Sequence, residues 1–173
     1  MKSVDSISWL QRVSRLLFKN FEYPLHSVQS VCEGVMKKLL FICNKEQILE
    51  IMKIVSLHNS IHEIKSKFLT LNLALDHIDA LQYIKENPTV IKEMIYFSKE
   101  TQVLGKYVLA FFESFLRKLW TSFEGKQDKW FEIWIDDYLN ALRSGDDGLR
   151  SAVCSYITPI VIKINKISLP FIL

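Results

Sequence analysis

Glycine and proline are scarce in this sequence, with five glycines and four prolines among 173 residues. A chain so poor in turn-forming residues is poorly suited to the many tight turns of a β-sandwich or β-barrel. Long uncharged runs are missing too, because the most apolar stretches are interrupted by Glu113, Lys163 and Lys166. A membrane-spanning helix needs roughly 20 apolar residues, so we expect no membrane insertion.

Cysteine is rare as well. Cys32, Cys43 and Cys154 are odd in number, form no C-x-x-C pair and lie within apolar helical patterns. This usage predicts reduced thiols in the core rather than disulfides. Residues 1–5 contain no apolar signal-peptide segment. Both observations favour the cytosol or the nucleus, and we expect a cytoplasmic protein.

Motifs that carry catalysis are not found either. The sequence has no nucleophile elbow, no paired-carboxylate motif and no glycine-rich phosphate loop, so we expect neither an enzyme nor a cofactor. His58 and His62 are four residues apart, a spacing that suits zinc when both lie on one helix. The intervening Asn59 and Ser60 indicate a helix break, and we favour a solvated loop over a metal site.

What the sequence does contain is helical periodicity along most of its length. No strand-type alternation of any length accompanies it. The segment 106–120 is apolar on more than one face, which is typical of a helix covered on two sides. Trp120, Trp130 and Trp134 fall at helical spacing, which predicts core packing rather than base stacking. Helices are expected over about residues 6–20, 25–43, 45–57, 61–75, 77–85, 88–99, 102–123, 128–142 and 146–164.

Two distant segments align without gaps, residues 17–42 (LFKNFEYPLHSVQSVCEGVMKKLLFI) and residues 138–163 (YLNALRSGDDGLRSAVCSYITPIVIK). In both, a helix ends, a few turn residues pass and a second amphipathic helix begins. A helix-turn-helix unit of about 40 residues is typical of armadillo and HEAT arrays. The sequence therefore predicts an all-α chain, one armadillo/HEAT-type helical repeat solenoid segment over residues 1–173.

The turn in the second segment, Gly145–Gly148, resembles a ligand loop at first sight. A calcium loop needs further oxygen ligands and a distal Glu, and a phosphate loop needs Gly-Lys-Ser/Thr; neither pattern is present. Asp146 or Asp147 suits the N-cap of the following helix, and Arg150 can bond to a neighbouring turn. We interpret the segment as a repeat turn, with Asp147 and Arg150 as structural residues.

Positive charge is concentrated in the first half of the chain. The net charge is +3, and the first 75 residues hold ten Lys/Arg against six Asp/Glu. This mild excess permits contact with nucleic acid without requiring it. Lys37, Lys38, Lys65 and Lys67 together are candidates for phosphate contact, although each alone also fits a solvated helix face.

Three stretches, in this order and spacing, resemble the thyroid-adenoma-associated (THADA) family. The first is a turn with the pattern Phe-Glu-x-Pro that leads into a helix. The second is a Lys-x-Lys-Phe pattern before a Leu-rich helix, and the third is a repeat with Leu-Arg-Ser and Tyr-x-x-Pro. They are found at residues 21–24, 65–68 and 130–173.

The resemblance implies a large armadillo/HEAT-type protein that is the non-catalytic partner of a tRNA 2′-O-methyltransferase acting on the anticodon loop. The methyltransferase would carry S-adenosylmethionine, while the solenoid binds and places the tRNA. Lys37, Lys38, Lys65 and Lys67 would then contact tRNA or the methyltransferase. Family members are much longer and contain an Arg-Arg-Ser-Ala-Gly-Leu-Pro stretch that is missing here, so we expect part of a longer chain. The alternative is a HEAT-type protein-binding scaffold without an RNA role.

Overall fold

The computed structural model describes residues 2–22, 24–57, 63–100, 102–122 and 132–168. Within these ranges every regular element is helical and no strand occurs, which confirms the all-α class. None of the described helices is both long and apolar enough to cross a membrane. The chain divides into two compact units, residues 1–83 and 84–173, with the boundary inside α5 (Ile78–Glu86). One continuous solenoid over residues 1–173 stays a prediction.

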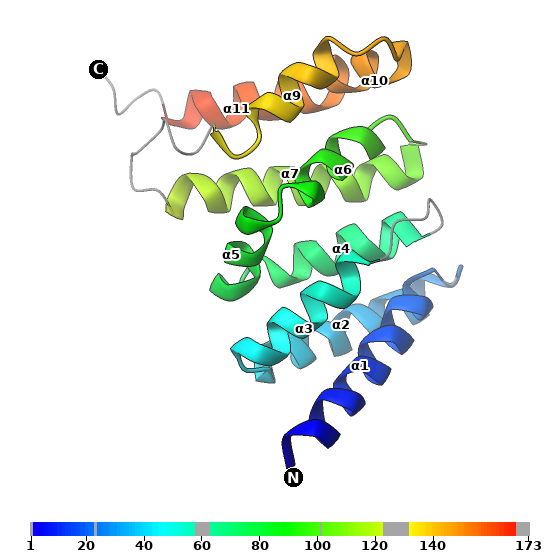
Figure 1. Cartoon of the computed structure of the whole chain (residues 1–173). Helices are drawn as coiled ribbons and strands as arrows, with labels where there is room; N and C mark the ends of the chain where they lie inside the picture. Colours follow the sequence, from blue (N-terminus) through cyan, green and yellow to red (C-terminus); the bar gives the residue numbers. More distant parts are fainter. Residues whose placement is uncertain (1, 23, 58–62, 101, 123–131, 169–173) are drawn as a thin grey trace. The chain divides into compact units, whose positions relative to one another are not determined.

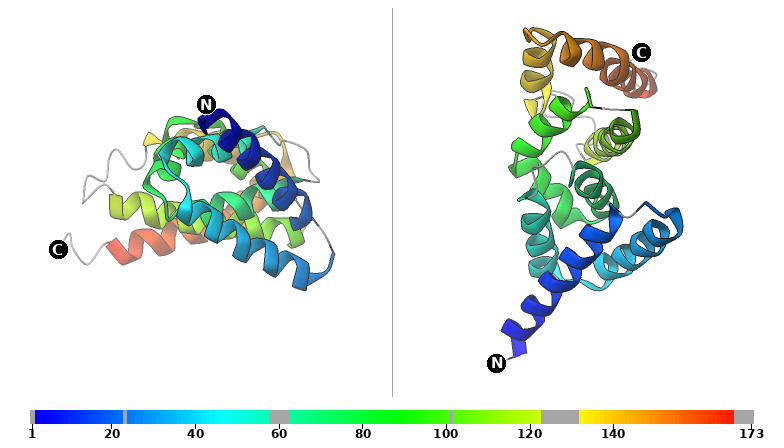
Figure 2. Two further views of the ribbon diagram at one scale, coloured as in Figure 1. Left: turned by 90° about the horizontal axis from the view of Figure 1, so that it is seen from below. Right: turned by 90° about the vertical axis from the view of Figure 1, so that its right-hand side faces the viewer.

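The first unit is built on α1 (Lys2–Phe21), α2 (His26–Ile42), α3 (Lys45–Ser56) and α4 (Ile64–Ala74). α1 packs against α2, α3 and α4, and both α2 and α3 also pack against α4 (Figures 1 and 2). The short turn between α2 and α3 is set locally by a capping box. The Asn44 side chain accepts from the Gln47 backbone N–H, and the Gln47 side chain accepts from the Asn44 N–H, both at 3.0 Å.

The core of this unit follows the apolar spacing of its helices. Burying each large side chain contributes about 1.5–3 kcal/mol relative to leaving it exposed. α4 is the most enclosed helix, because Ser66, Lys67 and Thr70 are buried along with its apolar residues. The buried apolar side chains of the other three helices include Leu10, Leu17, Phe18, Phe21, Cys32, Met36, Leu39, Leu40, Ile48, Ile51, Met52 and Val55.

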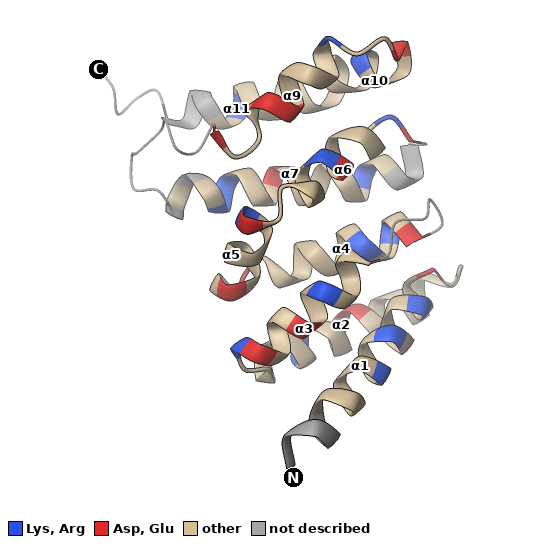
Figure 3. Ribbon diagram, viewed as in Figure 1, with Lys and Arg blue, Asp and Glu red and all other residues tan. Residues whose placement is uncertain are grey.

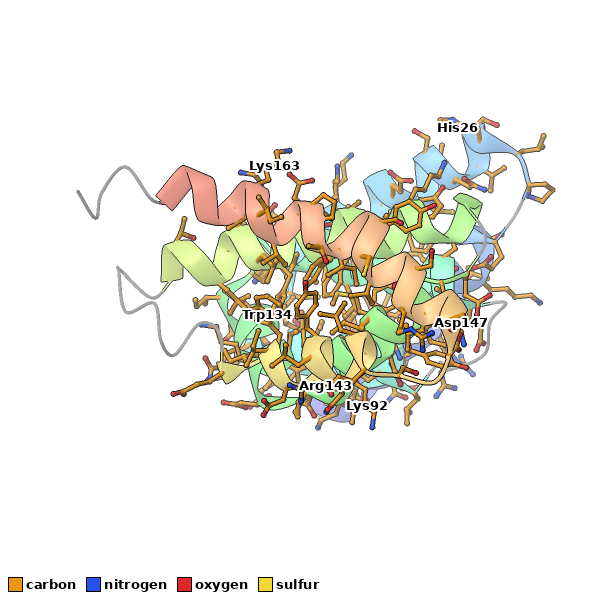
Figure 4. All side chains as sticks on the ribbon, turned by 90° about the horizontal axis from the view of Figure 1, so that it is seen from above. His26, Lys92, Trp134, Arg143, Asp147 and Lys163 are labelled. Atoms are coloured by element: carbon orange, nitrogen blue, oxygen red, sulfur yellow. The ribbon has the colours of Figure 1, made fainter. Side chains whose placement is uncertain are left out.

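The second unit contains α6 (Thr89–Phe97), α7 (Gln102–Ser122), α9 (Ile135–Leu142), α10 (Asp147–Ala152), the π-helix η2 (Val153–Ile157) and α11 (Thr158–Ser168). α6 packs against α7 and α9, and α11 packs against α7. Trp134 is buried and makes edge-to-face contacts with Phe112 and Tyr138, at centroid distances of 6.0 and 5.6 Å. Figure 4 shows it directed inward, whereas Lys163 and Arg143 project outward. Core packing is therefore confirmed for Trp134; Trp130 and the side chain of Trp120 lie outside the described part.

The helix expected without interruption over 146–164 contains a π turn instead. The backbone N–H of Thr158 donates to the carbonyl of Val153, five residues earlier. The Thr158 hydroxyl donates to the same carbonyl at 3.0 Å and lies 2.8 Å from the Tyr138 hydroxyl. Pro159 supplies the physical reason, because proline lacks an N–H and its ring clashes with the carbonyl four residues back in a regular helix. The wider π turn accommodates it.

The two aligned segments have matching helix boundaries. α1 ends at Phe21 and α9 at Leu142, and α2 begins at His26 and α10 at Asp147, so both pairs are 121 residues apart. The packing is less similar, since the π turn has no counterpart in α2 and Val31 is exposed where Ala152 is buried. The boundaries agree with the alignment, and the armadillo/HEAT class stays a prediction.

The three thiols differ in exposure. All are free cysteines, but Cys32 is buried, Cys43 is half-buried and Cys154 is exposed. Burial raises the pKa of Cys32 and Cys43. The expectation of three core thiols is wrong for Cys154, because in η2 the neighbouring Val153 and Ile157 occupy the inward positions.

Replacing Trp134 tests how much the second unit depends on this aromatic cluster. Trp134→Ala leaves a large cavity and should lower the free energy of unfolding by about 3–5 kcal/mol. Trp9→Ala is the matched control, because Trp9 is 56% exposed and its loss should change stability by less than about 0.5 kcal/mol. Urea unfolding followed by circular dichroism measures both. Equal effects of the two substitutions would contradict the assigned core.

Candidate nucleic-acid interface

The four lysines selected from the sequence lie in different environments. Lys37 and Lys38 are exposed on α2, and Lys65 is half-buried on α4. Lys67 is in the interior, with only 1% of its surface exposed, so it does not offer its ammonium group to a ligand in solvent. The selection of Lys67 is corrected on this ground. α4 packs against three other helices, and the sequence of α4 alone does not reveal that enclosure.

Ser66, between Lys65 and Lys67, forms a contact that joins the end of α1 to the start of α4. The Glu22 carboxylate accepts a hydrogen bond from the Ser66 backbone N–H at 3.1 Å and another from the Ser66 hydroxyl. Ser66 lies in the first turn of α4, where N–H groups have no partner within the helix. Glu63, the residue at the N-cap, makes no side-chain cap. A carboxylate 44 residues away therefore caps α4.

This contact brings together two of the stretches that resemble the THADA family. Glu22 belongs to the Phe-Glu-x-Pro turn, and Ser66 stands between the lysines of the Lys-x-Lys-Phe pattern. The aromatic residues of the two patterns, Phe21 and Phe68, are both fully buried. The geometry thus assigns these residues a structural part in the first unit.

A cationic row that the sequence analysis missed runs along α1. Arg12, Arg15 and Lys19 are all exposed, whereas Leu10 and Phe18 face the core. Figure 3 shows these basic positions as blue bands along the helix. None of the three makes an ion pair within the described part of the chain. We call these three residues the α1 row.

The spacing of the α1 row suits an extended polyanion. Positions i, i+3 and i+7 share one side of a helix and extend over roughly 10 Å at 1.5 Å per residue. Trp9, 56% exposed, precedes Arg12 by one turn, and an indole at such a position can stack on a base. The signal is present in the sequence, because the three basic residues recur at helical spacing within the helix expected over residues 6–20.

Several acids and bases of the second unit pair with one another. Asp146, rather than Asp147, is the N-cap of α10, and its side chain accepts from the Leu149 N–H at 3.0 Å. Lys99 donates to Asp146 at 2.6 Å and lies 4.0 Å from the centre of the Tyr96 ring. The hydrogen bonds from Lys99 and then Leu149 lower the pKa of Asp146, and the contact with Asp146 raises the pKa of Lys99.

The remaining contacts of this turn are also internal. Arg150 donates to the carbonyl of Ser144 and to the Asp147 carboxylate, which confirms that it bonds to the neighbouring turn. On the outside of the unit, Glu113 accepts from Arg117 at 2.7 Å and from Lys163 at 3.0 Å. Both bonds lower the pKa of Glu113. The turn is held by its own side chains, as expected for a structural turn.

The pockets within the described part of the second unit include a smaller and a larger one. The smaller pocket has a volume of about 220 Å³, and Asp137 and Lys92 are among the residues that line it. Burial raises the pKa of Asp137, and the positive charge of Lys92 partly offsets this increase. No group of three or more His, Cys, Asp or Glu side chains in the described residues is arranged to hold a metal ion. His58 and His62 lie outside those residues. The larger pocket, of about 420 Å³, is lined by Ser98, Lys99, Glu100, Gly105, Lys106, Leu109 and Tyr156.

Comparisons with known proteins identify no relative. No family model matches the sequence, and no curated protein and no solved structure matches the chain. The resemblance to the THADA family therefore rests on the three sequence stretches, and the candidate interface rests on the geometry of α1, α2 and α4.

A double-mutant cycle tests the cap that Glu22 provides. Glu22→Ala and Ser66→Ala should each lower the free energy of unfolding by about 1 kcal/mol. The double variant should lose less than the sum, because both substitutions remove the bond from the Ser66 hydroxyl, whereas the bond from the Ser66 backbone N–H is lost only with Glu22. Glu33→Ala, on α2, is the control and should stay within about 0.5 kcal/mol of the wild type. Strict additivity of the two changes would contradict the hydroxyl bond, and a wild-type stability of Glu22→Ala would contradict the cap on α4.

Asp146 provides a test with a defined pH dependence. Asp146→Asn keeps a good N-cap but loses the ion pair with Lys99, Asp146→Ala loses both, and Asp147→Ala spares both. At neutral pH the melting temperature should be highest for the wild type, lower for Asp146→Asn and lowest for Asp146→Ala. Asp147→Ala should melt close to the wild type.

The pH dependence follows from the lowered pKa of Asp146. A lowered folded-state pKa stabilises the protein above the ordinary Asp value of about 3.9. That contribution is lost as pH falls through the folded-state pKa, so the gap between wild type and Asp146→Asn should close below about pH 4. A gap that persists at lower pH would contradict the assigned ion pair.

Proposed function

We propose that this chain is a non-catalytic, cytoplasmic helical-repeat adaptor that supports 2′-O-methylation of the tRNA anticodon loop by a partner methyltransferase. The observation that carries the proposal is the α1 row, three exposed cations without an acidic partner in the described structure, next to Trp9. The resemblance to the THADA family supplies the class of RNA and the class of enzyme.

The armadillo/HEAT repeat is part of this proposal. It is supported by the equal spacing of helix ends and helix starts in the hairpins α1–α2 and α9–α10. It is also supported by the turn before α10, where Asp146 caps the helix and Arg150 bonds back to Ser144. Repeated helical hairpins present long surfaces and are well suited to holding an extended ligand.

In this mechanism the chain contributes binding and orientation, and the methyltransferase contributes the chemistry. Arg12, Arg15 and Lys19 contact tRNA phosphates, with the arginines able to form two parallel hydrogen bonds to one phosphate. Trp9 stacks on an unpaired base. Lys37, Lys38 and Lys65 remain candidates for further contacts to the tRNA or to the partner.

A protein-binding scaffold without an RNA role is the second candidate. The observation that favours it is the number of large apolar side chains that α2 exposes. Retention of a defined protein partner at high salt, with no tRNA bound, distinguishes this candidate from the first, because contacts to phosphates weaken steeply as salt rises.

Charge reversal of the α1 row tests RNA binding. The variant Arg12→Glu, Arg15→Glu, Lys19→Glu should bind tRNA at least about tenfold more weakly than the wild type. The slope of log affinity against log salt should fall by about 2–3, as expected for three lost phosphate contacts. Lys53 is exposed on α3, and Lys53→Glu is the control that measures the effect of reversing one charge outside the α1 row. An unchanged affinity and slope in the triple variant would refute phosphate contact by α1.

The methylation itself needs a separate measurement. Mass-spectrometric mapping of 2′-O-methyl groups in tRNA anticodon loops, with the gene intact and deleted, should show the loss of one specific methyl group. Restoring the wild-type gene should restore the methyl group, and restoring the triple-Glu variant should do so less well. An unchanged map would overturn the methylation role even if purified protein binds tRNA.

A further inference from the structure

α2 is apolar on two faces, and the described structure covers one of them. The inner face contributes Met36, Leu39 and Leu40 to the core. Exposed large apolar residues that group together usually mark an interaction surface. On the outer side the exposed fractions are 66% for Val31, 42% for Val35, 85% for Phe41 and 71% for Ile42.

The spacing of the outer residues matches a helix-pairing seam. Val31, Val35, Lys38 and Ile42 follow one another at steps of four, three and four residues, the alternation of the a and d positions of a coiled coil. Gly34 lies beside this seam, and a Cβ added to it would meet nothing within 4 Å. A second helix can therefore approach the backbone of α2 closely at this point. We call Val31, Val35, Lys38 and Ile42 the α2 seam.

Charge decides which helix fits the α2 seam. Lys38 stands within the seam and is exposed, whereas the neighbouring Lys37 is turned by roughly 100° onto another exposed side of the helix. A cation in an otherwise apolar seam favours a partner with an acid opposite and disfavours uncharged or basic partners. A second copy of this chain would place the lysines of both copies along one seam, where like charges repel.

We propose that the α2 seam binds an amphipathic helix of a partner protein, one with an apolar stripe and with Asp or Glu opposite Lys38. The binding mode is the pairing of two helices along apolar faces, with charge selecting the partner. This proposal does not rest on RNA binding, because the α1 row takes no part in it.

Two synthetic, fluorescein-labelled peptides of three heptads test the proposal against the full chain. Both carry leucine at the seam positions; one is flanked by Glu and the other by Lys. In fluorescence anisotropy the acidic peptide should bind at least about tenfold more tightly than the basic one. Lys38→Glu should reverse that preference, which a merely nonspecific apolar contact would not do.

Val35→Asp is the second variant, since it places a charge in the α2 seam at an exposed position that should leave folding intact. It should weaken both peptides by at least about tenfold. Lys53→Glu and the triple-Glu variant of the α1 row should bind the acidic peptide as the wild type does. Failure of RNA binding and failure of this proposal are therefore separate results.

Three outcomes would overturn the proposal. The first is that neither peptide binds, and the second is that both bind equally well to wild type and Val35→Asp. The third is that light scattering shows a dimer of the chain that Val35→Asp dissolves, which would assign the α2 seam to a second copy. Loss of tRNA binding in the Lys38→Glu variant, with no peptide bound by the wild type, would assign Lys38 to RNA instead.

Discussion

The hydrogen bonds from Ser66 to Glu22 are the constraint on which the surfaces of the first unit depend. They fix the end of α1 against the start of α4 and satisfy an N–H that α4 cannot satisfy itself. With α1 held in this way, Leu10, Leu17 and Phe18 are buried and Arg12, Arg15 and Lys19 are left in solvent. The capping contact and the candidate RNA surface are thus two consequences of the same helix orientation.

The α1 row differs in its pairing from several charged residues of the second unit. In the second unit, Lys99 forms an ion pair with Asp146, and Glu113 forms ion pairs with both Arg117 and Lys163. These charges therefore stabilise contacts within the unit itself. In the first, the α1 row has no such acidic partner in the described structure. An unpaired cation retains its attraction for an external anion, whereas one held by a carboxylate loses most of it. This difference is why the candidate interface is assigned to α1.

The α1 row and the α2 seam favour different ligands although they belong to consecutive helices. Cations beside an exposed indole suit a flexible polyanion, whose affinity depends on salt. An apolar seam with one embedded lysine suits a helix, whose affinity depends on apolar area and on a single matched charge. The proposed adaptor role would use both kinds of contact, and Lys38, one of the four lysines selected from the sequence, fits the second kind.

The all-α class and most helix positions followed from the sequence alone, because both depend on side-chain spacing and on capping residues within a few positions of one another. Within the helix expected over residues 128–142, however, α9 begins only at Ile135. The capping turn at Asp146 and the bond from Arg150 to that turn were predictable for the same reason. Tertiary structure decided what no local pattern contains. Lys67 is buried and Cys154 exposed because of what surrounds their helices, and Asp146 rather than Asp147 is the cap that Lys99 reaches from 47 residues away. Periodicity shows which face of a helix is apolar, but the neighbours that cover that face come from distant parts of the chain.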